Sequence, residues 1–330
     1  MGCFFLKKVN TYKILLNVFA SVIEFIIKIK GDFMKKILVV GSLNMDMVTK
    51  VAETPKVGET VSGDGLELIP GGKGANQAVA LAKLGANVEM VGLLGQDANG
   101  RMLKENLCKM GVENKCVKML ENVPTGLALI MVNTSGDNSI VVIPGANGEI
   151  GPDNVKAEWF KGVDYVLCQL EIPVETVEQV LRMAKEVGAK TILNPAPARR
   201  LSRNLLSLVD ILIPNQTEFE LLTEIKISVK EDLIRGYQYL NTLGIKELIV
   251  TLGEKGALYY NGKDFIEVAA KTVKVVDTTA AGDSFIAGVC DSLARGLSML
   301  QALEMGTKLA AITVTRFGAQ SSLPTRYEIG

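Results

Sequence analysis

The stretch DTTAAGDSF, residues 277–285, contains residue types that suit phosphate chemistry. Ala280, Ala281 and Gly282 are small, so backbone N–H groups there can approach a ligand closely. Apolar residues with helical spacing follow, and the expected buried face comprises Ile286, Val289, Cys290, Leu293 and Leu297. Because a helix N-terminus carries partial positive charge and unpaired N–H groups, the stretch predicts an anion hole.

Asp283 lies in this predicted anion hole and allows two interpretations. As a helix cap, it would stabilise the helix by ~0.5–2 kcal/mol. As a general base, it would accept the proton of an alcohol that attacks phosphorus, while the amides of Ala281, Gly282 and Asp283 stabilise charge on the transferred group. A cap does not require the preceding Ala-Ala-Gly, so the pattern favours the base.

A second glycine cluster, GGKGANQA at residues 71–78, is typical either of a tight turn into a helix or of a ligand-binding loop. Gly71 and Gly72 would let the backbone come close to a ligand. Asn76 offers a donor and an acceptor of the kind that bind sugar hydroxyls. Together with Asn44 and Asp46, which follow the first expected strand, this cluster would form a polyol pocket.

The composition limits the chemistry. The 330 residues contain no histidine, which excludes Ser-His-Asp and Cys-His catalysis and His-ligated zinc. Lys plus Arg equals Asp plus Glu, 36 each, so no net field attracts nucleic acid or a membrane surface. Neither a Walker-type G-x-x-x-x-G-K-[ST] nor a G-x-G-x-x-G after the first strand is present. We therefore expect a small-molecule substrate and a phosphate site of another kind.

The five cysteines are scattered and form no C-x-x-C pair. This spacing is typical of small buried residues in a reducing compartment, so we expect a cytoplasmic protein.

The elements that must position these residues alternate along the chain. Apolar runs of strand length are separated by amphipathic helical patterns such as 174–187 and 233–243. Continuous apolar strands between such helices predict an α/β fold with a doubly wound, mostly parallel sheet. The expected strands are 37–41, 88–95, 165–170, 191–193, 211–213, 248–252 and 273–276.

Polar residues and glycines follow most of these expected strands. They include Asn44 and Asp46, Glu171, Asn194, Asn215 and Glu218, GEKG at 253–256, and DTTAAGD at 277–283. Open parallel sheets bind ligands at the carboxyl ends of their strands, so one edge of the sheet is expected to carry the chemistry.

Two regions interrupt the alternation. Residues 47–51 with 61–69, and 127–133 with 140–143, have strand patterns without an intervening helix. They are expected to pair as a small sheet within about 47–69 and 127–145, which would be either a lid or ordinary surface hairpins.

The first 33 residues are expected to be an extension outside the fold, which would occupy residues 34–330. Residues 14–29 are mostly apolar, but Glu24 and Lys28 interrupt them and the run is shorter than the ~20 residues of a spanning helix. Met34 is the expected natural start; a membrane-surface helix is the alternative.

Eight segments carry a resemblance to a known family. They are GSLNMD, GGKGANQA, QLEIP, NPAPAR, PNQTE, TLGEKG, VDTTAAGDSF and TRFGAQSSLP, in this order, and the resemblance spans Met34 to about Arg326. GGKGAN together with DTTAAGD is a highly specific pair. On these residues the chain resembles the ribokinase-like family of carbohydrate kinases.

The resemblance implies a doubly wound α/β domain with a small β-sheet lid, often dimeric through that lid. It also implies transfer of the ATP γ-phosphoryl group to O5 of D-ribose, with ATP, Mg²⁺ and K⁺ as cofactors. Asp283 would be the catalytic base, beside the anion hole of Ala280, Ala281 and Gly282.

The resemblance further implies three sets of binding residues. Ribose would be bound by Asn44, Asp46, Gly72, Lys73, Asn76 and Glu171. The nucleotide would lie along Asn215, Thr251, Gly253, Gly256, Gly282 and Thr307, where Thr307 replaces a histidine common in relatives. Potassium would be bound near Asp277, Thr279, Thr313, Arg316, Gly318 and Ser322, and Glu218 would hold magnesium through water.

Two other functions remain open. A kinase of the same fold could use another acceptor, such as a nucleoside, fructose or a keto-deoxy sugar acid. A non-catalytic sugar or nucleotide sensor is the other alternative, although a sensor has no reason to keep Asp283 and an intact anion hole.

Overall fold

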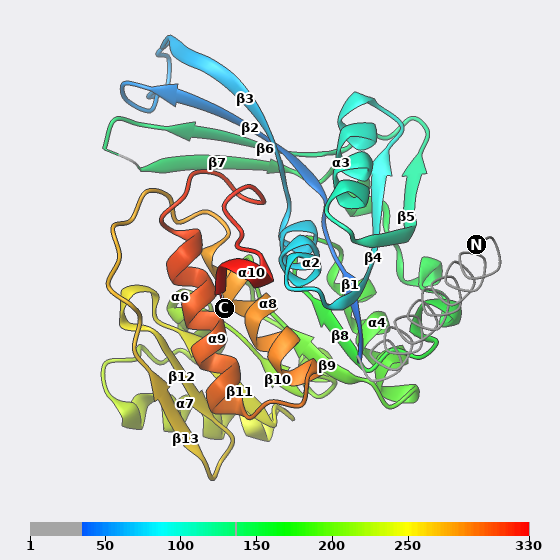
Figure 1. The fold of residues 1–330 in the computed structure, drawn as a ribbon, viewed down its shortest axis with the longest axis vertical. Helices are drawn as coiled ribbons and strands as arrows, with labels where there is room; N and C mark the ends of the chain where they lie inside the picture. Colours follow the sequence, from blue (N-terminus) through cyan, green and yellow to red (C-terminus); the bar gives the residue numbers. More distant parts are fainter. Residues whose placement is uncertain (1–34, 136, 330) are drawn as a thin grey trace, which may run out of the picture. The chain divides into compact units, whose positions relative to one another are not determined.

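A computed structural model describes residues 35–135 and 137–329 of the chain. The expected N-terminal extension lies outside the described residues. Two sheets and two helix layers form the described part (Figure 1).

The main sheet has nine strands within the described residues, in the order β13-β12-β11-β10-β9-β8-β1-β4-β5. Pairing is parallel from β5 to β11 and antiparallel at β11–β12 and β12–β13. The mostly parallel α/β fold expected from the sequence is confirmed. The strands are β1 (Lys36–Val40), β4 (Asn87–Gly95), β5 (Glu113–Leu120), β8 (Tyr165–Cys168), β9 (Lys190–Leu193), β10 (Ile211–Leu212), β11 (Glu247–Thr251), β12 (Ala257–Tyr260) and β13 (Phe265–Val268).

Helices cover both faces of this sheet because its strands are apolar on both sides. In β1, Ile37 and Val39 belong to one buried cluster, whereas Leu38 and Val40 belong to the other. The first cluster includes residues of α2 (Lys73–Lys83), α3 (Ala98–Lys109), α8 (Ala281–Ala294) and α9 (Met299–Thr313). The second includes residues of α4 (Val174–Glu186), α5 (Arg203–Leu206), α6 (Gln216–Thr223) and α7 (Lys230–Thr242).

The short helices complete the described chain. They are η1 (Gly145–Glu149), η2 (Pro152–Asn154), η3 (Ala157–Phe160), η4 (Gly253–Lys255) and α10 (Arg326–Ile329). No helix within 35–135 and 137–329 is long and apolar enough to cross a bilayer.

A separate four-stranded sheet has the order β3-β2-β6-β7 (Figure 1). The central pair β2–β6 is parallel, and the outer pairs are antiparallel. Its strands are β2 (Asn44–Val51), β3 (Gly63–Gly71), β6 (Gly126–Val132) and β7 (Asn138–Ile143). The small sheet expected from the sequence is therefore present.

One expected strand is absent, and one helix is shorter than expected. Residues 273–276 form no strand, although their alternating valines favour one. Their side chains are exposed, and Val276 N–H donates to the carbonyl of Val314 (2.7 Å) rather than to a neighbouring strand. Helix α8 ends at Ala294, so Leu297 lies beyond it and is exposed. The alternation was misleading because no strand in the described part of the chain pairs with this segment.

Candidate active site

The candidate site lies where the first turns of α2 and α8 meet the loops after β1 and β8. Helix α2 begins at Lys73 after Gly72, and α8 begins at Ala281 after Ala280. The two helices pack against each other in the described structure. Six predicted residues converge there with Asp283: Asn44, Asp46, Gly72, Lys73, Asn76 and Glu171.

Asp283 is held by side chains from α2. Asn76 Nδ2 donates to Oδ2 (3.0 Å), and Gln77 Nε2 donates to Oδ1 (2.9 Å). Asp283 is the third residue of α8 and only 7% exposed, and the N-cap is Ala280. Because both carboxylate oxygens bind α2 rather than the backbone of α8, the geometry does not support the helix-cap interpretation.

Burial raises the pKa of Asp283 above its ordinary value, while the Lys73 ammonium and the amides of Gln77 and Asn76 oppose that rise. A raised pKa brings a carboxylate closer to the range in which a general base works at neutral pH.

Acidic groups surround Lys73. Burial alone would lower the pKa of Lys73, but the carboxylates of Asp283, Glu171, Glu218 and Asp46 together raise it. Lys73 is therefore charged at neutral pH. Its backbone N–H donates to Glu171 Oε2 (3.0 Å), which also accepts from Ser42 Oγ (2.6 Å).

Asp46 is buried on β2. Its burial and the charges of Glu171 and Asp283 raise its pKa to about 7. The adjacent Gly71 on β3 is required by space, since a Cβ there would lie 2.1 Å from Asp46 Oδ2. The backbone at Gly71 therefore packs closely against the Asp46 carboxyl, and the nearby carboxylates disfavour its ionised form.

The turn into α2 requires glycine at position 72. Gly72 has φ 87°, and a Cβ would lie 2.7 Å from the backbone nitrogen of Asn44. Asn44 is in turn held by Asn147, whose Nδ2 donates to Asn44 Oδ1 (2.7 Å) and to the carbonyl of Leu43 (3.0 Å). Sequence reasoning missed Asn147, which lies in the short helix η1 and carries no recognisable motif.

The first turn of α8 has the open N–H groups expected of an anion hole. Ala280 has φ 59°, and its carbonyl accepts the first hydrogen bond of the helix, from Ser284 N–H (2.9 Å). Ala281 N–H donates to Thr278 (3.2 Å). The N–H groups of Gly282 and Asp283 have no acceptor among the described residues, and a Cβ on Gly282 would meet open space. Two of the three predicted amides are thus free to bind an anion.

The predicted nucleotide residues lie after β10 and β11. Asn215 and Glu218 form a capping box at the start of α6, with Glu218 N–H donating to Asn215 Oδ1 (2.8 Å). Asn215 also pairs with Thr251 in an isolated bridge. Gly253 and Gly256, which follow β11, have φ 59° and 101°.

Two further predicted residues are buried. Burial raises the pKa of Glu218 despite its hydrogen bond from the Asn215 backbone. Thr307, on α9, is 6% exposed, and its hydroxyl has no hydrogen-bond partner among the described residues.

The predicted potassium residues gather around Asp277. Asp277 Oδ1 accepts from the backbone N–H and hydroxyl of Thr279 (2.8 and 2.7 Å), and Oδ2 accepts from Gly318 N–H (2.9 Å). The carboxylate therefore closes a turn and also ties it to the C-terminal segment.

The side chains of three other members of that set are already engaged in contacts, so their backbone carbonyls are the simplest cation ligands. The hydroxyls of Thr313 and Ser322 donate to the carbonyls of Leu309 and Ala319. The Arg316 guanidinium pairs with Glu328 (2.5 Å). Such carbonyls suit a hard cation, and magnesium commonly needs only one or two carboxylates with phosphates and water. No group of three or more potential Asp, Glu, Cys or His ligands occurs in the described part of the chain.

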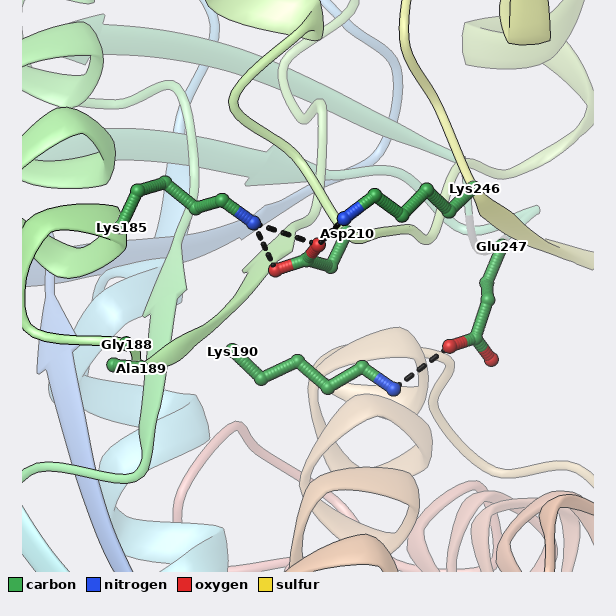
Figure 2. Close-up of a pocket in the computed structure, with 7 residues that line it drawn as sticks. All are labelled: Lys185, Gly188, Ala189, Lys190, Asp210, Lys246 and Glu247. Atoms are coloured by element: carbon green, nitrogen blue, oxygen red, sulfur yellow. Dashed lines mark hydrogen bonds and ion pairs between the residues drawn. The ribbon is translucent and has the colours of Figure 1, made fainter.

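A pocket of about 390 Å³ lies at the amino-terminal ends of strands in the main sheet, opposite the candidate active site (Figure 2). Lys190 and Glu247 are the first residues of β9 and β11, and Asp210 directly precedes β10. Lys185 and Lys246 both contact Asp210 there (2.7 and 2.8 Å). Each lysine in the pocket is already paired, so we interpret this pocket as an ion-pair network rather than as the active site.

The chain belongs to the pfkB family of carbohydrate kinases, whose model matches residues 34–326. It is 40% identical to a ribokinase of Haemophilus influenzae over 89% of this chain and 97% of that protein. It is 36% identical to a deoxyribokinase of Salmonella typhimurium, covering 88% and 95%. An Arabidopsis thaliana ribokinase solved with ribose and ATP superposes with a TM-score of 0.84 at 34% identity, covering 90% and 97%. The resemblance inferred from the motifs is confirmed.

Proposed function

We propose that this chain transfers the γ-phosphoryl group of ATP to O5 of D-ribose, giving ribose 5-phosphate and ADP. One observation carries the proposal. The buried carboxylate of Asp283 is oriented by two amides and lies in the same helical turn as the free N–H groups of Gly282 and Asp283. Similarity to ribokinases over about nine-tenths of the chain supports ribose as the acceptor.

In the proposed reaction, Asp283 accepts the proton of the attacking O5 hydroxyl. The O5–phosphorus bond forms as the bond between the γ-phosphorus and the bridging oxygen of ADP breaks. The free N–H groups of the first turn of α8 stabilise the charge on the transferred group. Asn44, Asp46, Asn76 and Glu171 bind the sugar hydroxyls, with Lys73 and Gly72 completing that pocket.

The nucleotide and metal assignments are part of the same proposal. Glu218 would hold Mg²⁺ through water, and Asp277 with neighbouring backbone oxygens would hold K⁺. When bound, Mg²⁺ would neutralise charge on the phosphates, and K⁺ at Asp277 would hold the loop that precedes the anion hole. The nucleotide residues would be Asn215, Thr251, Gly253, Gly256 and Thr307.

The remaining assignments concern the setting of the enzyme. Residues 34–330 would be the kinase domain, with the small sheet as its lid, and residues 1–33 would be dispensable. The four described cysteines are free, which supports a reducing compartment such as the cytoplasm. A protein that begins at Met34 should match the full chain in turnover and melting temperature; lower turnover would contradict the dispensable extension.

Replacing Asp283 tests the proposed base. Asp283→Asn keeps the shape but cannot accept the proton, so turnover should fall by roughly 10²–10⁴. Ribose binding, measured by calorimetry, should persist. Retained turnover with only a lower melting temperature would instead support a structural role.

2-Deoxyribose is the second candidate acceptor, because a deoxyribokinase is 36% identical over 292 residues. Formation of ADP should be measured with ribose, 2-deoxyribose, fructose and nucleosides, each with K⁺ and with Na⁺. The proposal expects the highest kcat/KM with ribose. A preference for 2-deoxyribose or a nucleoside would reassign the acceptor, and equal rates in K⁺ and Na⁺ would remove the potassium assignment.

A further inference from the structure

Two chains of side-chain amides, here called the amide relays, converge on the Asp283 carboxylate. In the first relay, Gln169 Nε2 donates to Gln77 Oε1 (2.5 Å), and Gln77 Nε2 donates to Asp283 Oδ1 (2.9 Å). Gln169 therefore donates towards Asp283, and Gln77 accepts on the side away from Asp283 and donates on the side towards it.

The second relay reaches the other carboxylate oxygen in the same sense. Asn106 Nδ2 donates to Gln320 Oε1 (2.6 Å), Gln320 Nε2 donates to Asn76 Oδ1 (3.2 Å), and Asn76 Nδ2 donates to Asp283 Oδ2 (3.0 Å). It therefore begins on α3 and passes through the segment after α9.

Burial makes these contacts significant. Gln77 and Gln169 are 0% exposed, and Gln320 is 3% exposed. Burying a primary amide is unfavourable unless its donors and acceptor are bonded. Gln77 satisfies its groups fully, because its Nε2 also reaches Asn194 Oδ1 (3.3 Å). A purely apolar core would place leucine or methionine at these positions.

The direction of the relays follows from the charge of Asp283. An ionised carboxylate only accepts, so the Gln77 NH₂ group must face Asp283 and its oxygen must face Gln169. Gln169 then donates its NH₂ group to the Gln77 oxygen. Its own Oε1 is left buried without a partner among the described residues. Reversing Gln169 would satisfy that oxygen no better and would place two amide oxygens against each other.

We propose that the amide relays are positioning elements that hold Asp283 ionised and oriented for proton transfer, with Gln77, Gln169 and Gln320 as positioning residues. This inference rests on the proposed function. A protonated Asp283 would need an acceptor for its new proton, but the pinned amides present only donors to it. The relays therefore favour the basic form of Asp283.

Charged groups also face Asp283 and must be included in any pH experiment. They are Lys73 on α2, Glu171 after β8, Asp46 on β2 and Glu218 on α6. The substitutions that test the relays leave these four charged residues unchanged, so a change in the pH profile reports on the amides.

The experiment compares Gln77→Met, Gln320→Met and Gln169→Met with the parent chain. Loss of a donor to Asp283 raises its pKa, so the acid limb of the kcat–pH profile should move to higher pH by about one unit for Gln77→Met. For Gln77→Met and Gln169→Met the KM for ribose should change less than about threefold, because neither residue belongs to the sugar set. In the double variant Gln77→Met/Gln169→Met the shift should be no larger than in Gln77→Met, because both residues act through one relay.

A readout without turnover separates this inference from the proposed function. Titration of the Asp283 carboxyl carbon by ¹³C NMR, assigned through Asp283→Asn, should give a higher pKa in Gln77→Met than in the parent chain. If the parent lacks sugar kinase activity, the proposed function fails. If the parent is active and neither the profile nor the titration moves, this inference fails.

Thr191→Val is the matched control for loss of a buried polar contact. Thr191 is 0% exposed and lies near the amino-terminal end of β9, away from the candidate active site. Its hydroxyl donates to the carbonyl of Leu208 (2.6 Å). It should lower the melting temperature without moving the acid limb. If Gln77→Met does not fold, Gln169→Met and Gln320→Met decide the outcome, and profiles that match Thr191→Val in both would overturn the proposal.

Discussion

At the scale of single residues, Asp46, which we propose as a sugar ligand, carries a cost in stability. Its pKa of about 7 means that the folded chain retains a proton that the unfolded chain loses near pH 4. The folded state binds more protons between those values, so the stability of the unliganded protein falls as the pH rises through that window. If Asp46 binds the sugar as proposed, binding and stability of the unliganded protein oppose each other at this position.

Asp46→Asn should raise the melting temperature of the unliganded protein by about 2–4 °C at pH 8 and change it little at pH 4. The same variant should raise the KM for ribose by roughly tenfold or more, because a charged acceptor is lost. Scanning fluorimetry at both pH values and steady-state kinetics measure the two effects. Asp64→Asn, on an exposed position of β3, is the control; a lower melting temperature for Asp46→Asn at pH 8 would contradict the expectation.

At the scale of secondary-structure elements, Asp210 joins the amino-terminal ends of the strands. It accepts from Lys185 on α4 and from Lys246 before β11 (Figure 2). It also accepts from the backbone and hydroxyl of Thr191 on β9 (3.1 and 3.0 Å). Burial alone would raise the pKa of Asp210, but these donors lower it well below the ordinary value. The network therefore stabilises the folded chain when Asp210 is ionised.

Asp210→Asn should lower the free energy of unfolding by ~1–3 kcal/mol at pH 7. The Lys246 side chain is 67% exposed, so water screens its share and the lower part of that range is expected. A depressed pKa gives stability that is present above pH 4 and is lost as the pH falls further, so the difference between variant and parent should shrink below that pH. Urea unfolding at pH 7 and pH 3 tests this.

Turnover is the second readout for Asp210→Asn. The proposed chemistry lies at the carboxyl ends of the strands, so kcat at a temperature where both proteins are folded should stay within about twofold of the parent. A large loss of kcat would show that the Asp210 network at the amino-terminal ends of the strands affects the chemistry at their carboxyl ends.

At the scale of the whole molecule, the small sheet presents an apolar row to solvent. Register pairs Leu68 with Met47, Met47 with Leu129, and Leu129 with Val141 across all four strands. Leu68, Leu129 and Val141 are 43%, 40% and 55% exposed. An exposed apolar strip of this kind is typical of an interface, and we propose that two copies of the chain pair through it.

Val141→Lys should weaken this proposed homodimer at least tenfold, because a lysine would be buried without a partner. Val187→Lys is the matched control, since Val187 is similarly exposed at 53% but follows α4. Size-exclusion chromatography with light scattering should find a dimer for the parent and the control, and more monomer for Val141→Lys. A monomeric parent at micromolar concentration would refute the interface.

The sequence by itself determined the α/β class, the small sheet and the helix that begins after Ala280. These depend on periodicity, glycines and polar residues at strand ends, which are local properties of the chain. The motifs also determined the family. Local pattern failed at residues 273–276, because alternation makes a strand only where a neighbour can pair with it.

Only the tertiary structure decided what Asp283 contacts. Asn76 and Gln77 precede it by 207 and 206 residues, and Gln320 reaches Asn76 from 244 residues away. No pattern within one element encodes such contacts, because they exist only after α2, α8 and the C-terminal segment pack together. The protonation preference of Asp283 likewise arises from burial and converging donors, which are products of that packing.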